Sequence, residues 1–204
     1  SAFFEARGDQ GIRELKMTID YINENYGDIV TILDAKRADT GNTNNGYVEF
    51  IFDWLGFDAF TIHPYLGHES VRPILDRKDK ASIILCRTSN PGAPEFQDLK
   101  VEGKPLWQIV AEKVSSEWNT NNNCMLVVGA TYPEEMKKIR SIAGDMIFLV
   151  PGIGAQGGSI EDVMKNGKDS NGRGLIISSS RGIIFTENPG EEAKKLRDEI
   201  RQYI

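Results

Sequence analysis

The chain has 204 residues, of which 40% are hydrophobic, and this length and composition suit one globular domain with a substantial core. Its net charge of −6 argues against general nucleic-acid binding and against attachment to an anionic membrane surface. No run approaches the roughly 18 consecutive apolar residues of a membrane span, and two cysteines in apolar runs are too few for a disulfide framework or a cysteine metal cluster.

Apolar, strand-like runs alternate with helical patterns along the chain, which is typical of repeated β-α-β units and a parallel sheet. Residues 2–4 resemble the last residues of a strand, and a helix is predicted at 9–25. Further strands are predicted at 29–34, 57–62, 81–87, 124–129, 146–150 and 174–179, with helices at 45–55, 68–76, 105–118, 133–142 and 159–166 and a last helix from Asn188.

The densest group of charges follows the apolar run 29–33. Asp34, Lys36 and Asp39 place one ammonium between two carboxylates. Opposite charges about 4 Å apart attract by about 4 kcal/mol at an effective dielectric near 20, so Lys36 is expected to stay protonated. A solvated charged turn is the alternative. Because the ends of strands carry the active sites of α/β folds, the group predicts a proton-handling site with Lys36 as a general acid.

Two loops late in the chain have the composition of an anion site. Residues 151–158 are glycine-rich and lead into a helix that Ser159 is expected to cap, and Arg181 follows the last strand. Backbone N–H groups, a helix N-terminus and an arginine fork all bind phosphate oxygens. A dinucleotide fingerprint fits less well, because it would come late in the chain and no acidic ribose partner follows. After strand 81–87, Ser89 could contact a heterocycle or belong to a simple turn.

The positions of these loops favour one of two α/β folds. Six strands satisfy a doubly wound open sheet, whereas a closed (β/α)₈ TIM barrel needs eight. Barrels commonly bind phosphate with the loops after strands 7 and 8, and the two anion loops follow the last two strands predicted here. We therefore expect a single TIM-barrel domain over residues 1–204, with the first strand-helix unit and most of the second strand absent from this sequence.

Taken together, these motifs resemble the orotidine 5′-monophosphate decarboxylase family. The resemblance rests on the run DAKRADTGNT from Asp34 to Thr43, and it takes in residues 2–5, 88–92, 151–158 and 179–181. It implies a (β/α)₈ barrel that works as a homodimer with shared active sites. The implied reaction converts orotidine 5′-monophosphate to UMP, the last step of de novo pyrimidine nucleotide biosynthesis, without a metal or an organic cofactor.

The resemblance also implies roles for individual residues. Asp34 would lie beside the departing carboxylate, and Lys36 would protonate the carbon left behind. Asp39 and Thr43 would reach into the site of the other subunit. The implied substrate-binding residues are Ser89 at the pyrimidine, Pro151 along the base pocket, and Gln156, Ser180 and Arg181 at the phosphate end. A further lysine and a ribose-binding aspartate of the family would precede Ser1, so we expect the sequence to be part of a longer protein.

Two other functions compete with this one. A sister family of sugar-phosphate decarboxylases and aldolases shares D-x-K-x-x-D but uses magnesium, and the loops at Ser89 and 154–158 favour the nucleotide enzyme over it. A nucleotide-phosphate binding module without turnover is the non-enzymatic alternative. Residues 1–5 lack the basic region of a signal peptide. We therefore expect a cytoplasmic protein with a small nucleotide substrate and no nucleic-acid or membrane partner.

Overall fold

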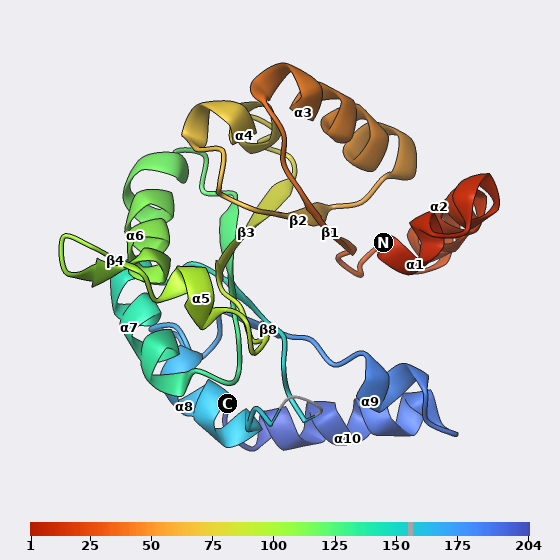
Figure 1. The fold of residues 1–204 in the computed structure, drawn as a ribbon. Helices are drawn as coiled ribbons and strands as arrows, with labels where there is room; N and C mark the ends of the chain where they lie inside the picture. Colours follow the sequence, from red (N-terminus) through yellow and green to blue (C-terminus); the bar gives the residue numbers. More distant parts are fainter. Residues whose placement is uncertain (155–156) are drawn as a thin grey trace. The chain divides into compact units, whose positions relative to one another are not determined.

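The computed structural model describes residues 1–154 and 157–204, which form two compact units. The first unit comprises Ser1–Leu85 and Trp118–Cys124, and the second comprises Cys86–Glu117 and Met125–Ile204. Parallel strands connected through helices form the framework of each unit (Figure 1).

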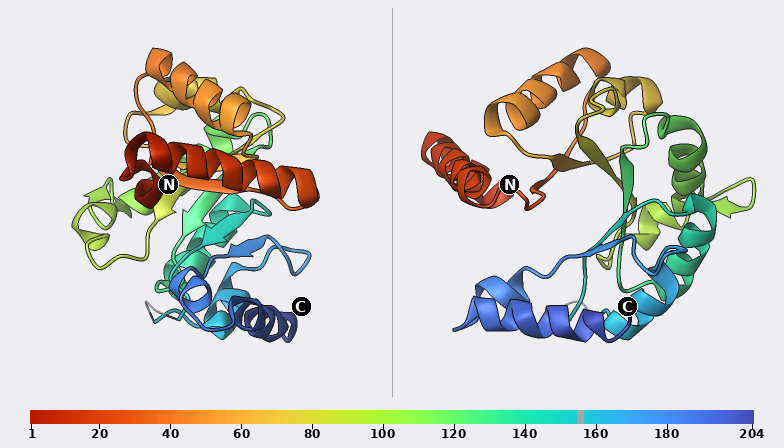
Figure 2. Two further views of the ribbon diagram at one scale, coloured as in Figure 1. Left: turned by 90° about the vertical axis from the view of Figure 1, so that its right-hand side faces the viewer. Right: turned by 180° about the vertical axis from the view of Figure 1, so that it is seen from behind.

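The first unit is built on β1 (Ile32–Arg37), β2 (Ala59–Ile62) and most of β3 (Ala81–Arg87). β1 pairs in parallel with β2, and β2 pairs in parallel with β3. The helices of this unit are α1 (Ala2–Glu5), α2 (Gly8–Asn25), α3 (Gly41–Val48), the π-helical η1 (Glu49–Leu55) and α4 (His68–Leu75). α3 and α4 lie side by side, as the views of Figures 1 and 2 agree.

The core of the first unit forms around β2. Both faces of this strand are buried, and Phe60 and Ile62 have no exposed surface. Phe52 of η1 packs edge-on against Phe60, with 5.0 Å between the ring centroids. A strand covered on both faces is expected to be apolar throughout, which explains why the sequence AFTI reads as a continuous run. Thr61 is the polar residue within it, and it is 1% exposed.

The second unit is built on β6 (Cys124–Val128), β7 (Phe148–Val150) and β8 (Leu175–Ile177), with β7 paired in parallel to both neighbours. Its remaining elements are α5 (Pro94–Gln97), a hairpin of β4 (Lys100–Val101) and β5 (Lys104–Pro105), α6 (Leu106–Lys113), η2 (Val114–Trp118), α7 (Pro133–Ala143), α8 (Ile160–Gly167), α9 (Arg181–Ile184) and α10 (Pro189–Arg201). α7 packs between α6 and α8, and α10 contacts α8 and α9.

The predicted alternation of strands and helices is confirmed, but two boundaries near the N-terminus were wrong. Residues 2–4 belong to helix α1, because the Ser1 carbonyl accepts hydrogen bonds from the N–H groups of Phe4 and Glu5. The first strand, predicted at 29–34, runs over Ile32–Arg37 instead. Asp34 and Lys36 therefore lie within a strand rather than after one. Pairing of Leu33 and Arg37 with β2 on either side keeps this charged segment in the strand, although its sequence has no strand pattern.

Both cysteines are buried and free, as expected for core residues. The Cys86 thiol donates a hydrogen bond to the Trp107 carbonyl at 3.2 Å. Burial raises the pKa of Cys86 to about 12 and that of Cys124 to about 12. Within the described residues, no helix combines the length and the apolar composition that crossing a bilayer demands.

Arg140 connects the segments that precede the last two strands of the second unit. Its guanidinium lies 3.7 Å from the centroid of the Phe148 ring, and burial lowers its pKa to about 10. It donates hydrogen bonds of 2.6–3.2 Å to the carbonyl oxygens of Gly144, Met146, Gly167 and Gly174. A single side chain thereby satisfies carbonyl groups around the start of β7 and the start of β8, where a polar group left unpaired would be costly.

We predict that Arg140→Met lowers the free energy of unfolding by about 3 kcal/mol, because hydrogen bonds from a charged donor are lost and the carbonyl groups that accepted them are left unpaired. Urea denaturation followed by circular dichroism measures this. Lys137→Met is the matched control, since Lys137 is exposed on the same helix and should change stability by less than about 0.5 kcal/mol. Equal losses in the two variants would contradict the role given to Arg140.

Candidate active site

The first unit places an ion pair near the carboxyl end of β1. The Lys36 ammonium lies 2.7 Å from Oδ1 and 2.6 Å from Oδ2 of Asp34. The two side chains are 54% and 59% exposed, so solvent and a ligand can reach them. The predicted contact between Asp34 and Lys36 is present in the structure.

A bulge in β1 sets the position of this pair. Leu33 pairs with Phe60 and Arg37 pairs with Ile62, so four steps along β1 match two along β2. Lys36 has φ = 50°, in the left-handed region, which is uncommon for a residue other than glycine. Its N–H donates to the Thr61 hydroxyl at 2.9 Å. Residues held in this conformation cluster at functional sites, because the surrounding structure must enforce it.

Hydrogen bonds keep the Asp34 carboxyl ionised. Burial of the carboxyl opposes ionisation and is the largest single influence on its pKa. The Lys36 ammonium and the Thr61 hydroxyl, which donates to Oδ1 at 2.8 Å, together outweigh it. The pKa of Asp34 therefore lies below its ordinary value, and the carboxylate carries a full negative charge at neutral pH.

Asp39 and Thr43 lie outside this pair, around the start of α3. The Asp39 carboxylate accepts a hydrogen bond from the N–H of Thr40 at 2.6 Å. The backbone of Asp39 is held by Asn44, whose amide donates to the Asp39 carbonyl at 2.7 Å and to the Ser70 carbonyl at 2.5 Å. Thr43 is exposed on the first turn of the helix. Asn44 is fully buried, so it fixes this segment against α4.

In the second unit, the carboxyl ends of successive strands are joined by backbone hydrogen bonds. The N–H of Gly129 donates to the carbonyl of Arg87 at 2.7 Å, and the N–H of Ala130 donates to that of Pro151 at 2.9 Å. The N–H of Ser178 donates to the carbonyl of Val150 at 3.0 Å. The loops that carry the predicted binding residues of this unit therefore begin at one edge of its strands.

Ser89 is held close to the loop that follows β6. A Cβ atom on Gly129 would lie 2.8 Å from the backbone nitrogen and from Cβ of Ser89, so only glycine permits this approach. The Thr131 hydroxyl lies 3.5 Å from the Ser89 carbonyl. Ser89 is thus fixed beside the start of the next loop, with its side chain partly exposed.

The two predicted anion loops are adjacent, because β7 and β8 pair in parallel. The loop from Pro151 closes through the N–H of Gly158, which donates to the Gly152 carbonyl at 3.0 Å, and Ser159 caps α8 as predicted. Ser180 and Arg181 are exposed at the start of α9. Within the described residues, no carboxylate lies within ion-pair distance of Arg181. Gln156, predicted at the phosphate, lies outside the described residues.

Two buried polar side chains, one in each unit, were not predicted as part of the site. Thr61 contacts both members of the ion pair, and a lone threonine in an apolar strand was its only signal in the sequence. Arg87 is 1% exposed, with Nη1 3.0 Å from Asp98, Nη2 3.7 Å from Glu135 and its guanidinium 3.7 Å from the centroid of the Tyr132 ring. It anchors the start of the loop that carries Ser89.

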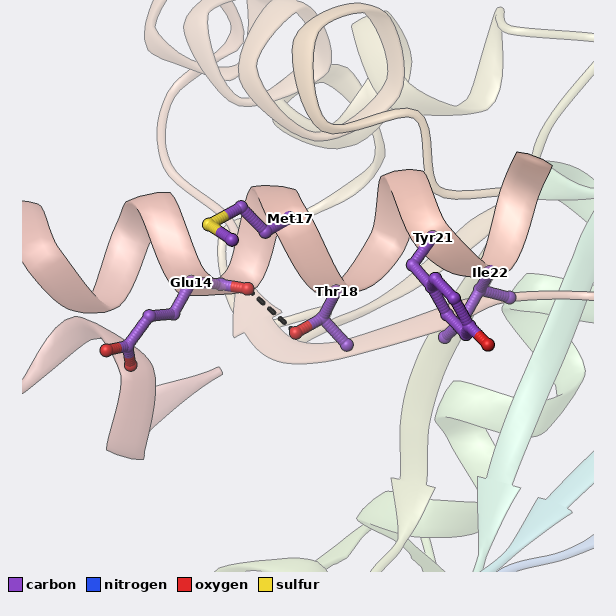
Figure 3. A pocket seen from close by; sticks show the side chains of 5 residues that line it. All are labelled: Glu14, Met17, Thr18, Tyr21 and Ile22. Atoms are coloured by element: carbon purple, nitrogen blue, oxygen red, sulfur yellow. Dashed lines mark hydrogen bonds between the residues drawn. The ribbon is translucent and has the colours of Figure 1, made fainter. Parts of the chain in front are cut away.

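Other surface features offer less chemistry. Figure 3 shows a shallow hollow on α2, where the Thr18 hydroxyl donates to the Glu14 carbonyl at 2.7 Å and Met17, Tyr21 and Ile22 supply apolar surface. The Glu14 carboxylate is already paired with Arg7. In the part of the chain that the structure describes, no group of three or more histidine, cysteine or acidic side chains is arranged to hold a metal ion.

Parallel strands joined through helices, with an ion pair near the carboxyl end of β1 and the two predicted anion loops after β7 and β8, are the arrangement of an α/β protein of the TIM-barrel type. Residues 1–196 match the family described as "Orotidine 5'-phosphate decarboxylase / HUMPS family". The chain belongs to this family.

Individual relatives agree with the family match. An orotidine 5′-phosphate decarboxylase of Cellvibrio japonicus is 47% identical over 196 residues, which are 96% of this chain and 71% of that protein. The solved structure of Leishmania donovani OMP decarboxylase has a TM-score of 0.93 at 38% identity and covers 99% of this chain and 78% of its own. The solved structure of Leishmania donovani UMP synthase has a TM-score of 0.95 at 40% identity, and the match covers 99% of this chain and 45% of that one.

We predict that the Asp34 carboxyl titrates below the ordinary value of about 3.9. Lys36→Met should move its midpoint upward, because the ammonium no longer counteracts the effect of burial. Carbon-13 NMR of the carboxyl measures this. Lys16→Met, which removes another lysine-aspartate pair of the same unit, should leave the midpoint unchanged.

The sign of the linked stability effect follows from the direction of this shift. A carboxyl whose pKa is lowered on folding stabilises the folded state above its unfolded pKa, and this contribution is lost as the pH falls through the folded pKa. A midpoint for Asp34 at or above the ordinary value in the wild-type protein would contradict the electrostatic description of the pair.

Proposed function

We propose that this chain decarboxylates orotidine 5′-monophosphate to UMP, with Lys36 and Asp34 at the reacting centre. The family match and the similarity of the chain to decarboxylases support the reaction. The observation that supports the assignment of residues is the contact of the Lys36 ammonium with both oxygens of Asp34, at 2.6 and 2.7 Å, on an accessible strand end.

The proposed chemistry requires a fixed positive charge. When the bond between the ring carbon and the carboxylate breaks, CO₂ leaves and the electron pair stays on the ring carbon, which has no adjacent electron sink. A positioned ammonium stabilises this charge where it develops. Lys36 then transfers a proton from Nζ to the carbon, and because its side chain is about half exposed, it regains a proton from water.

We assign Asp34 the orientation of this ammonium. Its two oxygens both contact Nζ, and its low pKa keeps it ionised through mild acid. Placed beside the carboxylate of the substrate, the negative charge of Asp34 would disfavour the bound ground state.

The second unit supplies the proposed nucleotide-binding residues. Arg181 offers a guanidinium fork to the phosphate, with Gln156 and Ser180 as further donors. Ser89 and Pro151 are proposed to contact the pyrimidine. Binding energy from the phosphate, which does not react, can hold the carboxylate of the substrate against the charged pair.

We further propose a homodimer of single-domain, eight-stranded barrels in which Asp39 and Thr43 complete the partner's site. Thr43 is exposed on α3, and Asp39 is partly exposed just before this helix. Asp39 contacts backbone rather than Lys36 within its own chain. Asn44 and the N–H of Thr40 hold the segment in one conformation, which suits residues that must reach a defined position in another subunit.

We predict that Lys36→Ala lowers kcat by about 10⁴-fold or more, because both charge stabilisation and the proton donor are lost. The dissociation constant for UMP should change by less than about threefold. Arg181→Ala should instead raise KM by about 30-fold, the effect of losing charged hydrogen bonds to phosphate. The loss of orotidine monophosphate absorbance and calorimetric titration with UMP measure these effects.

Lys78→Ala is the control for a lysine of the first unit, since Lys78 is exposed. This substitution should leave kcat and the dissociation constant for UMP unchanged. Small and equal effects of the Lys36 and Arg181 substitutions would contradict the roles assigned. UMP binding by a wild-type protein that consumes no substrate would indicate a binding module. Loss of activity with a chelator would favour the magnesium-dependent sister reaction.

We predict that inactive Asp39→Ala and Lys36→Ala proteins regain activity on mixing, because a hybrid dimer then has one site that carries neither substitution. Random exchange would restore about a quarter of wild-type activity. Asp34→Asn mixed with Lys36→Ala is the control, since both changes fall in the same site of each chain and no intact site forms. Absence of rescue after demonstrated subunit exchange would remove Asp39 from a shared site.

A further inference from the structure

Thr61 makes two hydrogen bonds that converge on the reacting pair from the neighbouring strand. It is 1% exposed in β2, yet both hydrogen-bonding functions of its hydroxyl are used. Oγ1 accepts the N–H of Lys36 at 2.9 Å and donates to Oδ1 of Asp34 at 2.8 Å. One buried atom therefore contacts the backbone of the lysine and the side chain of the aspartate.

The first of these bonds compensates for the bulge. In a regular parallel ladder, backbone carbonyl groups of β2 would accept the N–H groups of β1 that face it. The register shift between Leu33 and Arg37 interrupts this pattern at Lys36. The Thr61 hydroxyl takes the place of a ladder acceptor and so stabilises the left-handed conformation at φ = 50°.

The second bond fixes the carboxylate. Oδ1 of Asp34 receives the Thr61 hydroxyl and the Lys36 ammonium, whereas Oδ2 contacts the ammonium alone. An exposed ion pair has little intrinsic rigidity, because long side chains exchange partners with water. A donor from a fully buried strand gives the carboxylate a defined orientation, and the carboxylate in turn directs Nζ.

We propose that Thr61 is a positioning residue for the decarboxylation, acting through Lys36 and Asp34 without touching the substrate. This role rests on the proposed function of the pair. The hydroxyl sets the backbone from which the lysine projects and the orientation of the carboxylate that holds it. Misplacement of a reacting group by about 1 Å can cost about 10²-fold in rate, so loss of the hydroxyl should act on kcat rather than on binding.

The test compares Thr61→Val, which replaces the hydroxyl with a methyl group, with Thr61→Ser, which keeps the hydroxyl. Thr61→Val should lower kcat by about 100-fold and change KM by less than about threefold. Thr61→Ser should restore kcat to within about threefold of wild type. Orotidine monophosphate turnover and UMP affinity are measured on each purified protein.

Thr31→Val is the matched control. Thr31 is 6% exposed and its hydroxyl donates to Oδ2 of Asp58 at 2.9 Å, so it is a second buried threonine bonded to an aspartate. It lies just before β1, and its hydroxyl is bonded to Asp58 rather than to Asp34 or Lys36. Thr31→Val should lower the melting temperature but leave kcat within about twofold of wild type. A purely structural role of buried hydroxyl groups would lower kcat in both variants.

Each outcome supports or overturns the role of Thr61. A Thr61→Val protein with the kcat of wild type overturns it, as does a Thr61→Ser protein as impaired as Thr61→Val. Should Thr61→Val fail to fold and to bind UMP, Thr61→Cys replaces it, because a thiol is a weak hydrogen-bonding group; equal kcat for the Ser and Cys variants then overturns the role. A wild-type protein without turnover overturns the proposed function itself, and the role of Thr61 with it.

Discussion

The candidate site depends on the contact between the Lys36 ammonium and the Asp34 carboxylate within a bulged strand. An exposed ion pair stabilises a folded protein by about 0–1 kcal/mol, whereas a left-handed residue other than glycine costs about 1–3 kcal/mol. The arrangement is therefore not a source of stability. It persists because the buried Thr61 hydroxyl satisfies the displaced N–H and orients the carboxylate. A preformed ammonium of this kind needs little reorganisation when negative charge develops beside it.

The second unit achieves its organisation through backbone groups more than through side chains. Hydrogen bonds between Arg87 and Gly129, and between Ala130 and Pro151, join the carboxyl ends of strands whose loops carry the proposed ligand contacts. Gly129 permits the close approach of Ser89, and the buried Arg87 connects this loop to the first turn of α7 through Glu135. Loops anchored in this way can differ in sequence between relatives without moving the positions from which they start.

Much of the fold and part of the site could be predicted because they depend on local patterns. The alternation of elements, the Ser159 cap and the Asp34-Lys36 pair follow from periodicity, capping chemistry and charge spacing. The bounds of β1 do not, because the segment DAKR joins the strand through the pairing of Leu33 and Arg37 with β2. The contacts of Thr61 depend on the register of two strands that are separated in sequence. Arg87 is buried, although charged residues are rarely buried. Neither property is encoded in neighbouring residues.

The burial of both cysteines has a practical consequence for spectroscopy. With their side chains buried and their pKa values raised to about 12, neither forms an appreciable thiolate near neutral pH. These are the two cysteines of the sequence. A cysteine introduced on an exposed helix would therefore react selectively with a maleimide dye or a spin label in the otherwise native protein, without prior replacement of either buried thiol.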